Sequence, residues 1–282
     1  GLEFRRVLFR SLRVRARRLV RMSAEQDLVA GEQDLGAGAA DDPTGTDRPA
    51  AGATAGGEEG ASARSTAVAP AAGAPAGGMA GVPESGGGPV VGEDGRARTP
   101  WAYGHPLLLD YYDTEWGLPV TTESGMFERL SLEGFQAGLS WLTILRKRPR
   151  FREVFADFDV DAVAAFDGSD VDRLLADPGI IRHRGKIEAC IRNARAAVDL
   201  REDGGLVAFI EGFAPETTPE PRTLAEVPTS SPESIALSKA LKKRGFGFVG
   251  PTTMYALFEA VGIVDTHVLG SHMRGASGRW PR

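Results

Sequence analysis

The amino-acid sequence predicts an all-α protein, a helical bundle that ends in a helix–hairpin–helix unit. Three observations support this prediction. After residue 99, apolar residues recur at the three- and four-residue spacing of helices, the alternation typical of strands does not persist, and capping residues precede several apolar runs.

The composition divides the 282 residues into a tail and one domain. Residues 31–98 are rich in Gly, Ala, Pro, Ser and acidic residues and offer little apolar surface to bury. Such a segment does not offset the entropy lost on ordering. We therefore expect residues 1–98 to be a disordered tail and residues 99–282 to form one domain with a single core.

The expected helices follow one another along the domain. The first four have their start signals at Ser124, after Pro149, at Asp161 and at Ser169. A long helix over 184–202 ends at Gly204 and Gly205, and the Pro-rich residues 215–232 predict a loop. The last two helices span 234–244 and 251–260.

The start of the chain is basic, with eight Arg and one Glu in the first 21 residues. It can be interpreted as a nucleic-acid tether, a transit-like leader, or a translation or cloning remnant, which the missing initiator Met favours. No run of 18 apolar residues and no secretory signal occurs. The only cysteine, Cys190, forms no intrachain disulfide and is expected to be buried, so the sequence favours the cytoplasm.

Charge distribution matters more than the net charge of the domain. Residues 99–282 contain 21 Lys and Arg against 25 Asp and Glu, which argues against a basic coat for nucleic acid. Two local basic clusters nevertheless occur, at residues 182–186 and 239–244. Each is either a solvated helix face or a contact for phosphate. In the first cluster, Arg182 and Arg184 are the candidate contacts.

A glycine-rich hairpin joins the last two helices and is a candidate anion site. Its glycines permit positive φ and close backbone approach, and Pro251 suits the first position of a helix. The amides that follow would point outward at the positive end of the helix dipole. The candidate contacts to a phosphate backbone are Lys242, Lys243, Arg244, Gly245, Gly247, Gly250 and Thr252.

Residues 101–141 combine aromatic rings with one carboxylate in an apolar context. Tyr111, Trp116 and Trp141 offer flat faces, and Glu133 lies within the apolar run LSLEGFQAGLSW. An ionised carboxylate there is costly unless a partner compensates it. A pocket for an extruded nucleobase needs these components, although a hydrophobic core with an exposed glutamate is the alternative interpretation.

Five blocks, in order and spacing, resemble the DNA-3-methyladenine glycosylase I family: YYDTEWGLP, LEGFQAGLSW, GIIRHRGKI, LSKALKKRGFGFVGPT and DTHVLG. The resemblance covers residues 99–271. It implies a monomeric DNA repair enzyme of the helix–hairpin–helix glycosylase superfamily, acting in base excision repair on double-stranded DNA that contains alkylated bases. The implied reaction is hydrolysis of the N-glycosidic bond of 3-methyladenine, without lyase activity.

The resemblance also implies roles for individual residues. Glu133 matches the family's base-contacting glutamate, with Tyr111, Trp116 and Trp141 around the base. Asp265 lies where the wider superfamily carries a catalytic aspartate, and the alternative is that it caps the terminal segment. A Leu-rich edge at residues 107–109 stands where relatives often carry a tyrosine, so the preferred lesion can differ.

The family commonly ties its ends together with zinc held by two Cys and two His. The matching positions here are Thr99, Tyr112, His267 and Ser271, so only His267 is retained. Hydroxyl groups are poor zinc ligands beside thiolate and imidazole. We therefore expect no cofactor, with packing of Tyr112 in place of the metal; a relocated site of His105, His267 and His272 is the alternative.

Two other functions remain open at the level of sequence. The lost metal ligands and the Leu-rich edge favour a catalytically weak paralogue that binds DNA lesions without turnover. A helical domain whose aromatic cage holds a cationic small molecule is the third interpretation.

Overall fold

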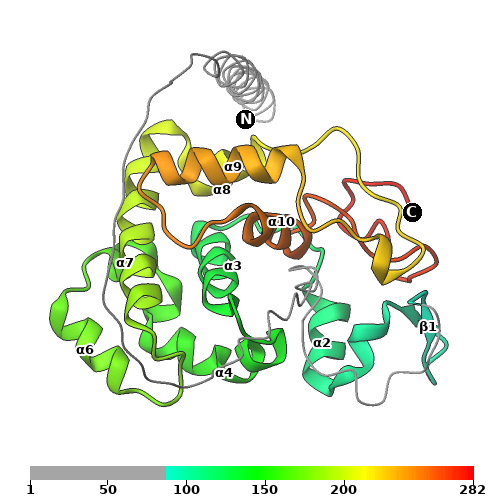
Figure 1. Ribbon diagram of the computed structural model, residues 1–282, viewed down its shortest axis with the longest axis horizontal. Coiled ribbons are helices and arrows are strands. Elements are labelled where there is room, and N and C mark those ends of the chain that lie inside the picture. Colours follow the sequence, from blue (N-terminus) through cyan, green and yellow to red (C-terminus); the bar gives the residue numbers. More distant parts are fainter. Residues whose placement is uncertain (1–86) are drawn as a thin grey trace, which may run out of the picture. The chain divides into compact units, whose positions relative to one another are not determined.

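The computed structural model describes residues 87–282, and the regular secondary structure of this part is helical except for one pair of short strands (Figure 1). The α-helices are α2 (Pro106–Thr114), α3 (Glu123–Gln136), α4 (Trp141–Val154), α5 (Val160–Ala164), α6 (Gly168–Ala176), α7 (Arg184–Asp199), α8 (Gly205–Glu211), α9 (Pro232–Lys243) and α10 (Pro251–Ala260). Short 3-10 helices span Pro100–Gly104, Ala156–Phe158, Leu200–Asp203 and Leu224–Glu226. The prediction of an all-α fold is confirmed.

The fold begins before the boundary predicted at residue 98. Strands β1 (Val90–Val91) and β2 (Ala97–Arg98) pair antiparallel. Arg98 is only 2% exposed, and its guanidinium binds Asp113 with two hydrogen bonds of 2.8 and 2.7 Å. Composition missed this segment because a buried ion pair, rather than apolar surface, anchors it. The expected disorder of residues 1–86 lies outside the described residues.

Three helices begin at other capping residues than predicted. In each case the true cap precedes the predicted residue by two positions, and its side-chain oxygen accepts a hydrogen bond from a backbone N–H of the first turn. These caps are Thr122 instead of Ser124, Asp159 instead of Asp161, and Asp167 instead of Ser169. Each pair consists of two good capping residues, so local propensity alone did not distinguish them.

Proline does not end a helix where the sequence predicted a boundary. Helix α4 begins at Trp141, capped by Ser140, and continues through Pro149. Its buried residues Ile144 and Phe151 lie on either side of that proline, and their packing offsets the lost backbone hydrogen bond. Two further helices, α2 and α8, were not predicted. Helix α7 ends at Asp199, and the 3-10 helix that continues it is capped by Gly204. This agrees with the prediction that Gly204 and Gly205 end the long helix.

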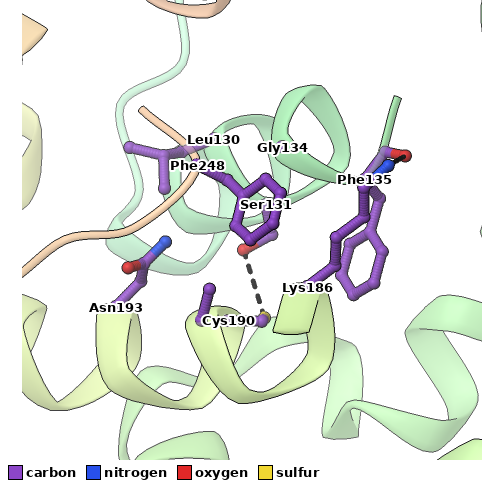
Figure 2. A pocket seen from close by; sticks show the side chains of 9 residues that line it. Leu130, Ser131, Gly134, Phe135, Lys186, Cys190, Asn193 and Phe248 are labelled. Carbon is purple, nitrogen blue, oxygen red and sulfur yellow. Dashed lines mark hydrogen bonds between the residues drawn. The ribbon is translucent and has the colours of Figure 1, made fainter. Parts of the chain in front are cut away.

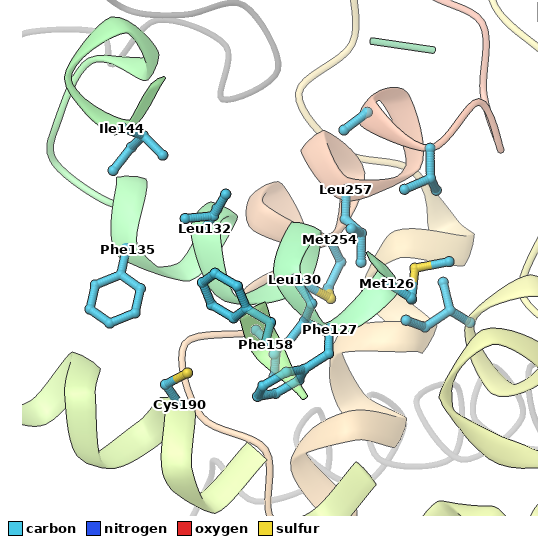
Figure 3. Packing of buried hydrophobic residues seen from close by; sticks show 14 of the residues in the cluster. Met126, Phe127, Leu130, Leu132, Phe135, Ile144, Phe158, Cys190, Met254 and Leu257 are labelled. Atoms are coloured by element: carbon cyan, nitrogen blue, oxygen red, sulfur yellow. The ribbon is translucent and has the colours of Figure 1, made fainter. Parts of the chain in front are cut away.

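Helix α3 lies at the centre of the core. It packs against α4, α7, α8 and α10, and ten of its residues are buried. Figure 3 shows its apolar side chains meeting those of α10, with Leu130 near Met254 and Leu257 on the other side of the interface. Because α3 is buried on nearly all sides, the one charged residue of its last two turns, Glu133, is carried into the core.

Candidate functional site

Three of the predicted site residues lie together between helices α2, α3 and α4. The rings of Tyr111 and Trp141 are 5.4 Å apart, measured between centroids. The guanidinium of Arg129 lies 5.9 Å from the centroid of the Tyr111 ring. The charges of Glu133 and Arg129 both act on the Tyr111 hydroxyl. The structure therefore brings Tyr111 and Trp141 together, within electrostatic reach of Glu133.

Several polar atoms of this site are buried without a hydrogen-bond partner. Within residues 87–282 this holds for the Tyr111 hydroxyl, the indole Nε1 of Trp141 and Nη1 of Arg129. The carboxyl of Glu133, 6% exposed, also has no hydrogen bond to any residue of this range. Folded proteins satisfy about 90% or more of their buried polar groups. A concentration of exceptions at one place indicates donors and acceptors kept for a ligand.

Burial controls the protonation of Glu133. Loss of solvent raises the pKa of its carboxyl well above the ordinary value, and the negative charge of Glu259 on α10 raises it further. Arg129 opposes this shift. Burial thus disfavours the ionised form of Glu133 in the site as it stands.

An ion-pair network holds Arg129 in place beneath this site. Glu115, at the end of α2, binds both Arg129 of α3 and Arg148 of α4, the latter at 2.9 Å. Arg148 also binds Glu128 at 2.8 Å. These pairs lower the pKa of Glu115 to about 2, although burial opposes the shift. The three helices that carry the site are thus joined by buried charges.

Trp116 belongs to a different group of rings from the one predicted. It packs on Trp101 at 5.1 Å, stacks on Tyr112 at 5.6 Å and meets His267 edge-on at 4.5 Å. No ring contact in the described part of the chain joins it to Tyr111 or Trp141. The structure therefore places Trp116 at the contact between α2 and the C-terminal segment.

The residues at the family's zinc positions form a hydroxyl cluster, which we call the Tyr112 clasp: Thr99, Tyr112, Ser271 and His267. The Tyr112 hydroxyl accepts from the Thr99 N–H at 3.1 Å, and lies 3.0 Å from Thr99 Oγ1 and 2.6 Å from Ser271 Oγ. Three hydroxyls and one imidazole do not fit zinc, which prefers thiolate and imidazole. The predicted packing of Tyr112 on the C-terminal segment is confirmed.

The alternative of a relocated metal site has no support in the geometry. Among residues 87–282, no group of three or more His, Cys, Asp or Glu is arranged to hold a metal. Nδ1 of His105 accepts from the Leu107 N–H as a helix cap, and Nδ1 of His272 lies 3.0 Å from the Ala97 carbonyl oxygen. His267 is buried, and Nδ1 of its ring lies 2.8 Å from Asp265.

Asp265 is fully engaged by the C-terminal segment. One carboxylate oxygen accepts from the His267 N–H at 3.1 Å, and the other accepts from the Gly275 N–H at 2.7 Å. Burial opposes ionisation, but the hydrogen bonds from His267 and Gly275 and the charge of Arg274 hold the pKa of Asp265 below its ordinary value. This geometry supports the alternative in which Asp265 caps the terminal segment.

The glycine-rich hairpin packs on α3 at Gly134, the residue that follows Glu133. The Cβ of Phe248 is 3.4 Å from the position that a Cβ on Gly134 would take. The sequence allowed positive φ at all three glycines of the hairpin. Gly245 adopts it, at 87°, whereas Gly247 and Gly250 do not. Phe248 also has a positive φ, at 55°. Space at Gly247 is limited by α7, because a Cβ there would lie 3.1 Å from the Cβ of Ala189 and 2.9 Å from the flexible guanidinium of Arg192.

The predicted backbone contacts surround this hairpin. Lys242, Lys243 and Gly245 are exposed, and Arg244 is half-exposed in an ion pair of 2.6 Å with Asp203. Gly250 begins α10 without a side-chain cap, so the first amides of that helix, including that of Thr252, meet no capping side chain.

Two residues of α7 were missed by the sequence analysis. The side chain of Asn193 accepts from the Gly247 N–H at 2.8 Å and donates to the Gly247 carbonyl oxygen at 3.1 Å, which fixes the hairpin on α7. Arg192 lies exposed beside it. The role of Asn193 had one available signal, namely a polar residue among the buried apolar residues of α7. Arg182 and Arg184 were the weaker candidates for contacts to DNA. Arg184, the first residue of α7, pairs with Asp172 at 3.0 Å, whereas Arg182, just before the helix, is exposed.

A small pocket between α3 and α7 lies below Phe248 (Figure 2). It has room for about one water molecule, so it cannot hold a purine. At its edge, the ammonium of Lys186 donates to the carbonyl oxygens of Phe135 and Ala137 at 2.9 and 2.6 Å. Lys186 thus fixes the end of α3 and the turn that leads to Trp141. Cys190, which lines the pocket, is buried as predicted.

The described residues define the class of protein as an all-α domain, in which a glycine-rich hairpin joins α9 to α10 and packs on α3, the helix that carries the buried Glu133. Within this class, the chain belongs to the methyladenine glycosylase family, whose sequence profile matches residues 101–274. The resemblance and the glycosylase class of enzyme predicted from the sequence are confirmed.

Relatives and solved structures agree with this assignment. The chain is 50% identical over 177 residues to DNA-3-methyladenine glycosylase 1 of Escherichia coli, covering 61% of this chain and 94% of the relative. It is 43% identical over 175 residues to DNA-3-methyladenine glycosylase of Haemophilus influenzae, with the same coverages. A crystal structure of 3-methyladenine DNA glycosylase I superimposes with a TM-score of 0.61 at 45% identity, covering 63% of this chain and 99% of that one.

A further solved structure addresses recognition of the base. It is the Staphylococcus aureus enzyme, described as the structural basis of 3-methyladenine recognition, with a TM-score of 0.58 at 34% identity. It covers 60% of this chain and 92% of that one.

Proposed function

We propose that the protein is a monofunctional DNA glycosylase that removes alkylated purines, most of all 3-methyladenine, from double-stranded DNA in base excision repair. The observation that carries this proposal is the group of buried polar atoms on Tyr111, Trp141 and Arg129 that have no partner among residues 87–282, next to the buried carboxyl of Glu133. A purine rotated out of the duplex would bring both flat faces and hydrogen-bonding edges to such a site.

The chemistry requires little beyond selection and positioning. Methylation at N3 makes the purine cationic, so the base is already a good leaving group. Water adds to the sugar C1′ as the N-glycosidic bond breaks; the base leaves with the electron pair, and the water loses a proton to solvent. The rings of Tyr111 and Trp141 attract a cation, and Glu133 accepts from the amino edge of the base.

Contacts to the DNA backbone would come from the hairpin and its surroundings. Lys242 and Lys243 are exposed beside the uncapped start of α10, where anions bind favourably. Arg192 adds a further exposed cation next to Gly247. The hairpin offers Thr252 where lyase members of the superfamily carry a lysine, which supports base removal without strand cleavage.

Two of the residues expected at the site are assigned other roles in this proposal. Trp116 packs within the Tyr112 clasp region rather than against the base, as its ring contacts with Trp101, Tyr112 and His267 support. Asp265 orders the C-terminal segment, as its bonds to His267 and Gly275 support. No metal enters the proposed reaction, because the clasp residues do not fit zinc.

The proposal extends to the setting of the enzyme. In this proposal the enzyme acts as a monomer. No helix among the described residues is long and apolar enough to cross a membrane. A chromosomal substrate in a bacterial cell places the enzyme in the cytoplasm, associated with the nucleoid through DNA.

The test is Glu133→Gln, which keeps the shape of the side chain. We expect excision of alkylated adenine to fall by about a hundredfold, because the variant cannot become an anion against the cationic base. Folding, followed by thermal unfolding, should be retained. Glu123→Gln, at the start of the same helix, where Glu123 pairs with Arg201 at 2.7 Å, is the matched control and should excise at the parent rate.

The role of Glu133 is refuted if its variant excises at the parent rate. Binding of lesion-containing DNA by the parent protein, without release of any base, would support the catalytically weak paralogue instead. Failure to bind DNA at low salt, where phosphate contacts are strongest, would favour a small-molecule binding domain.

A further inference from the structure

Arg129 of α3 is a buried cation that contacts the aromatic rings of the base site. It is only 8% exposed, and the central carbon of its guanidinium lies 5.9 Å from the centroid of the Tyr111 ring. The Tyr111 ring lies 5.4 Å from the ring of Trp141. A guanidinium within about 6 Å of an aromatic face makes a cation–π contact. Arg129 therefore belongs to the same group of side chains as the two rings.

The guanidinium of Arg129 is anchored at one terminal nitrogen and unpartnered at the other. Nη2 donates to a carboxylate oxygen of Glu115, whereas Nη1 is buried and has no partner among residues 87–282. Because a guanidinium is planar and its N–H groups form a rigid fork, the bond to Glu115 restricts the direction of Nη1. A buried donor without an acceptor destabilises the fold, so its presence indicates an acceptor supplied by a ligand.

The unpartnered atoms of the site define the chemistry of the ligand edge. Within residues 87–282 they are Nη1 of Arg129, Nε1 of Trp141 and the Tyr111 hydroxyl. A guanidinium and an indole can only donate, whereas a phenol donates or accepts. The ligand must therefore present an acceptor to each of the two obligate donors. Adenine methylated at N3 meets this requirement, because its ring nitrogens N1 and N7 carry lone pairs.

Arg148, the other buried arginine of the ion-pair network, has no such contact with the rings. Its Nη2 is also buried and unpartnered within the described residues, and its other nitrogens bind Glu115 at 2.9 Å and Glu128 at 2.8 Å. The cation–π contact to Tyr111 comes from Arg129. Arg129 is thus the arginine whose unpartnered nitrogen lies next to the rings.

We propose that Arg129 is a catalytic residue, which donates a hydrogen bond from Nη1 to a ring nitrogen of the departing purine. This inference rests on the proposed function. It goes further by naming the group that stabilises the base as it leaves the sugar.

The contribution of Arg129 follows from the movement of charge during cleavage. Before the N-glycosidic bond breaks, the base is cationic, and afterwards it is neutral and holds the electron pair of that bond. A guanidinium keeps its proton and its charge, so it binds the departed base more strongly than the cationic one. An interaction that strengthens as the bond breaks accelerates the reaction. The rings of Tyr111 and Trp141 offset the repulsion between Arg129 and the cationic base.

The experiment compares Arg129→Met with the matched control Arg152→Met, both in the full chain. Methionine keeps an unbranched, flexible side chain but has neither the charge nor the donors. Each variant removes one arginine from the same network and leaves its carboxylate with a second partner. Glu115 keeps Arg148 at 2.9 Å in the first variant. Glu128, which loses its 2.7 Å pair with Arg152 in the second, keeps Arg148 at 2.8 Å.

Two measurements report on the contact with the base. In calorimetric titrations, free 3-methyladenine should bind Arg129→Met at least about tenfold more weakly, because its ring nitrogen loses a charged donor. The single-turnover rate of excision from methylated double-stranded DNA should fall by about a hundredfold. Affinity for DNA should stay within about twofold of the parent, because the buried Arg129 makes no phosphate contact. Arg152→Met should match the parent in every measurement.

Unchanged binding of the free base, or an unchanged rate of excision, in Arg129→Met overturns the proposal. Equal losses in Arg129→Met and Arg152→Met overturn it too, since they would show that Arg129 acts only through the network. If Arg129→Met does not fold, Arg129→Lys replaces it, because lysine keeps the charge and the pair with Glu115 but lacks the fork. It should bind 3-methyladenine at least about fivefold more weakly than the parent. Undiminished binding by Arg129→Lys overturns the proposal.

The two proposals fail in different ways. A parent protein that releases 3-methyladenine, with Arg129→Met as fast as the parent, leaves the proposed function intact and refutes the role of Arg129. A parent protein that releases no base refutes the proposed function. The titration with free 3-methyladenine then still decides whether Arg129 contacts the base.

Discussion

Single buried side chains decide the chemistry of this site, because each lies where water cannot compensate it. Tyr111 and Trp141 each hold a buried polar atom without a partner among residues 87–282, and Glu133 and Glu259 are buried carboxyls on the packed helices α3 and α10. Such groups lower the stability of the empty protein. The presence of these buried polar groups is explained if binding of a ligand recovers the lost free energy of folding.

The pH dependence of stability gives a direct view of Glu259. Burial raises its pKa to about 8, so the folded protein holds a proton that the unfolded chain loses near pH 4.5. The free energy of unfolding therefore falls as pH rises between these values, by up to about 1.4 kcal/mol per pH unit. Glu259→Gln lacks this contribution.

The unfolding free energy of Glu259→Gln should therefore rise relative to that of the parent between pH 5 and pH 8. Urea unfolding at several pH values measures the difference, and the neighbouring His267 is common to both proteins and cancels. Parallel curves for the two proteins would show that Glu259 ionises normally.

Residue type alone predicted Glu133, Tyr111 and Trp141, since a carboxylate among apolar residues and nearby rings indicates a pocket. It did not predict Glu259, which looks like any helical glutamate until the packing of α10 on α3 is known. It assigned Trp116 to the wrong group of rings because aromatic side chains serve cores and pockets equally well.

Two local devices hold the elements of the site in position: the Tyr112 clasp and the bond between Asn193 and the hairpin. The clasp ties the residues before α2 to the segment after α10, through Thr99 and Ser271. Asn193 fixes Gly247 on α7 with two hydrogen bonds. Capping chemistry predicted the helices well, apart from shifts of two residues between equivalent caps, but these tertiary bonds leave no periodic signal.

The clasp predicts a stability cost for Tyr112→Phe. Removal of the hydroxyl leaves buried groups of Thr99 and Ser271 unpaired, which should lower the free energy of unfolding by about 1–3 kcal/mol. Tyr255→Phe is the matched control, because the Tyr255 hydroxyl is buried without a partner among the described residues and its loss should be neutral or stabilising. Urea denaturation measures both variants.

A metal chelator should leave the unfolding midpoint of the parent protein unchanged. Equal effects of the two Tyr→Phe variants, or a midpoint lowered by chelator, would show that the clasp is not what joins the two segments.

The hairpin predicts that Asn193→Ala weakens DNA binding without changing its salt dependence. The variant frees the Gly247 backbone, so the hairpin loses order and affinity should fall by about tenfold, while the number of phosphate contacts stays the same. In contrast, Lys242→Ala should reduce the slope of log affinity against log salt by about 0.9. Binding isotherms across salt concentrations separate these outcomes, and a reduced slope in Asn193→Ala would contradict the positioning role.

At the scale of the whole molecule, helix α3 connects every part of the account. It carries Glu133, packs on the helix that carries Glu259, and touches the hairpin through Gly134. Composition and helical spacing predicted the all-α domain, because most of its core is apolar and periodic. They misplaced its beginning, since a buried Arg98 bound to Asp113 adds residues 87–98 to the fold without apolar surface.

The most direct measurement is to incubate the purified protein with methylated double-stranded DNA and to identify the released base by mass. The account predicts release of 3-methyladenine from an otherwise intact strand, lost in Glu133→Gln. DNA that is bound but releases no base, or releases unmodified adenine at a comparable rate, would contradict it.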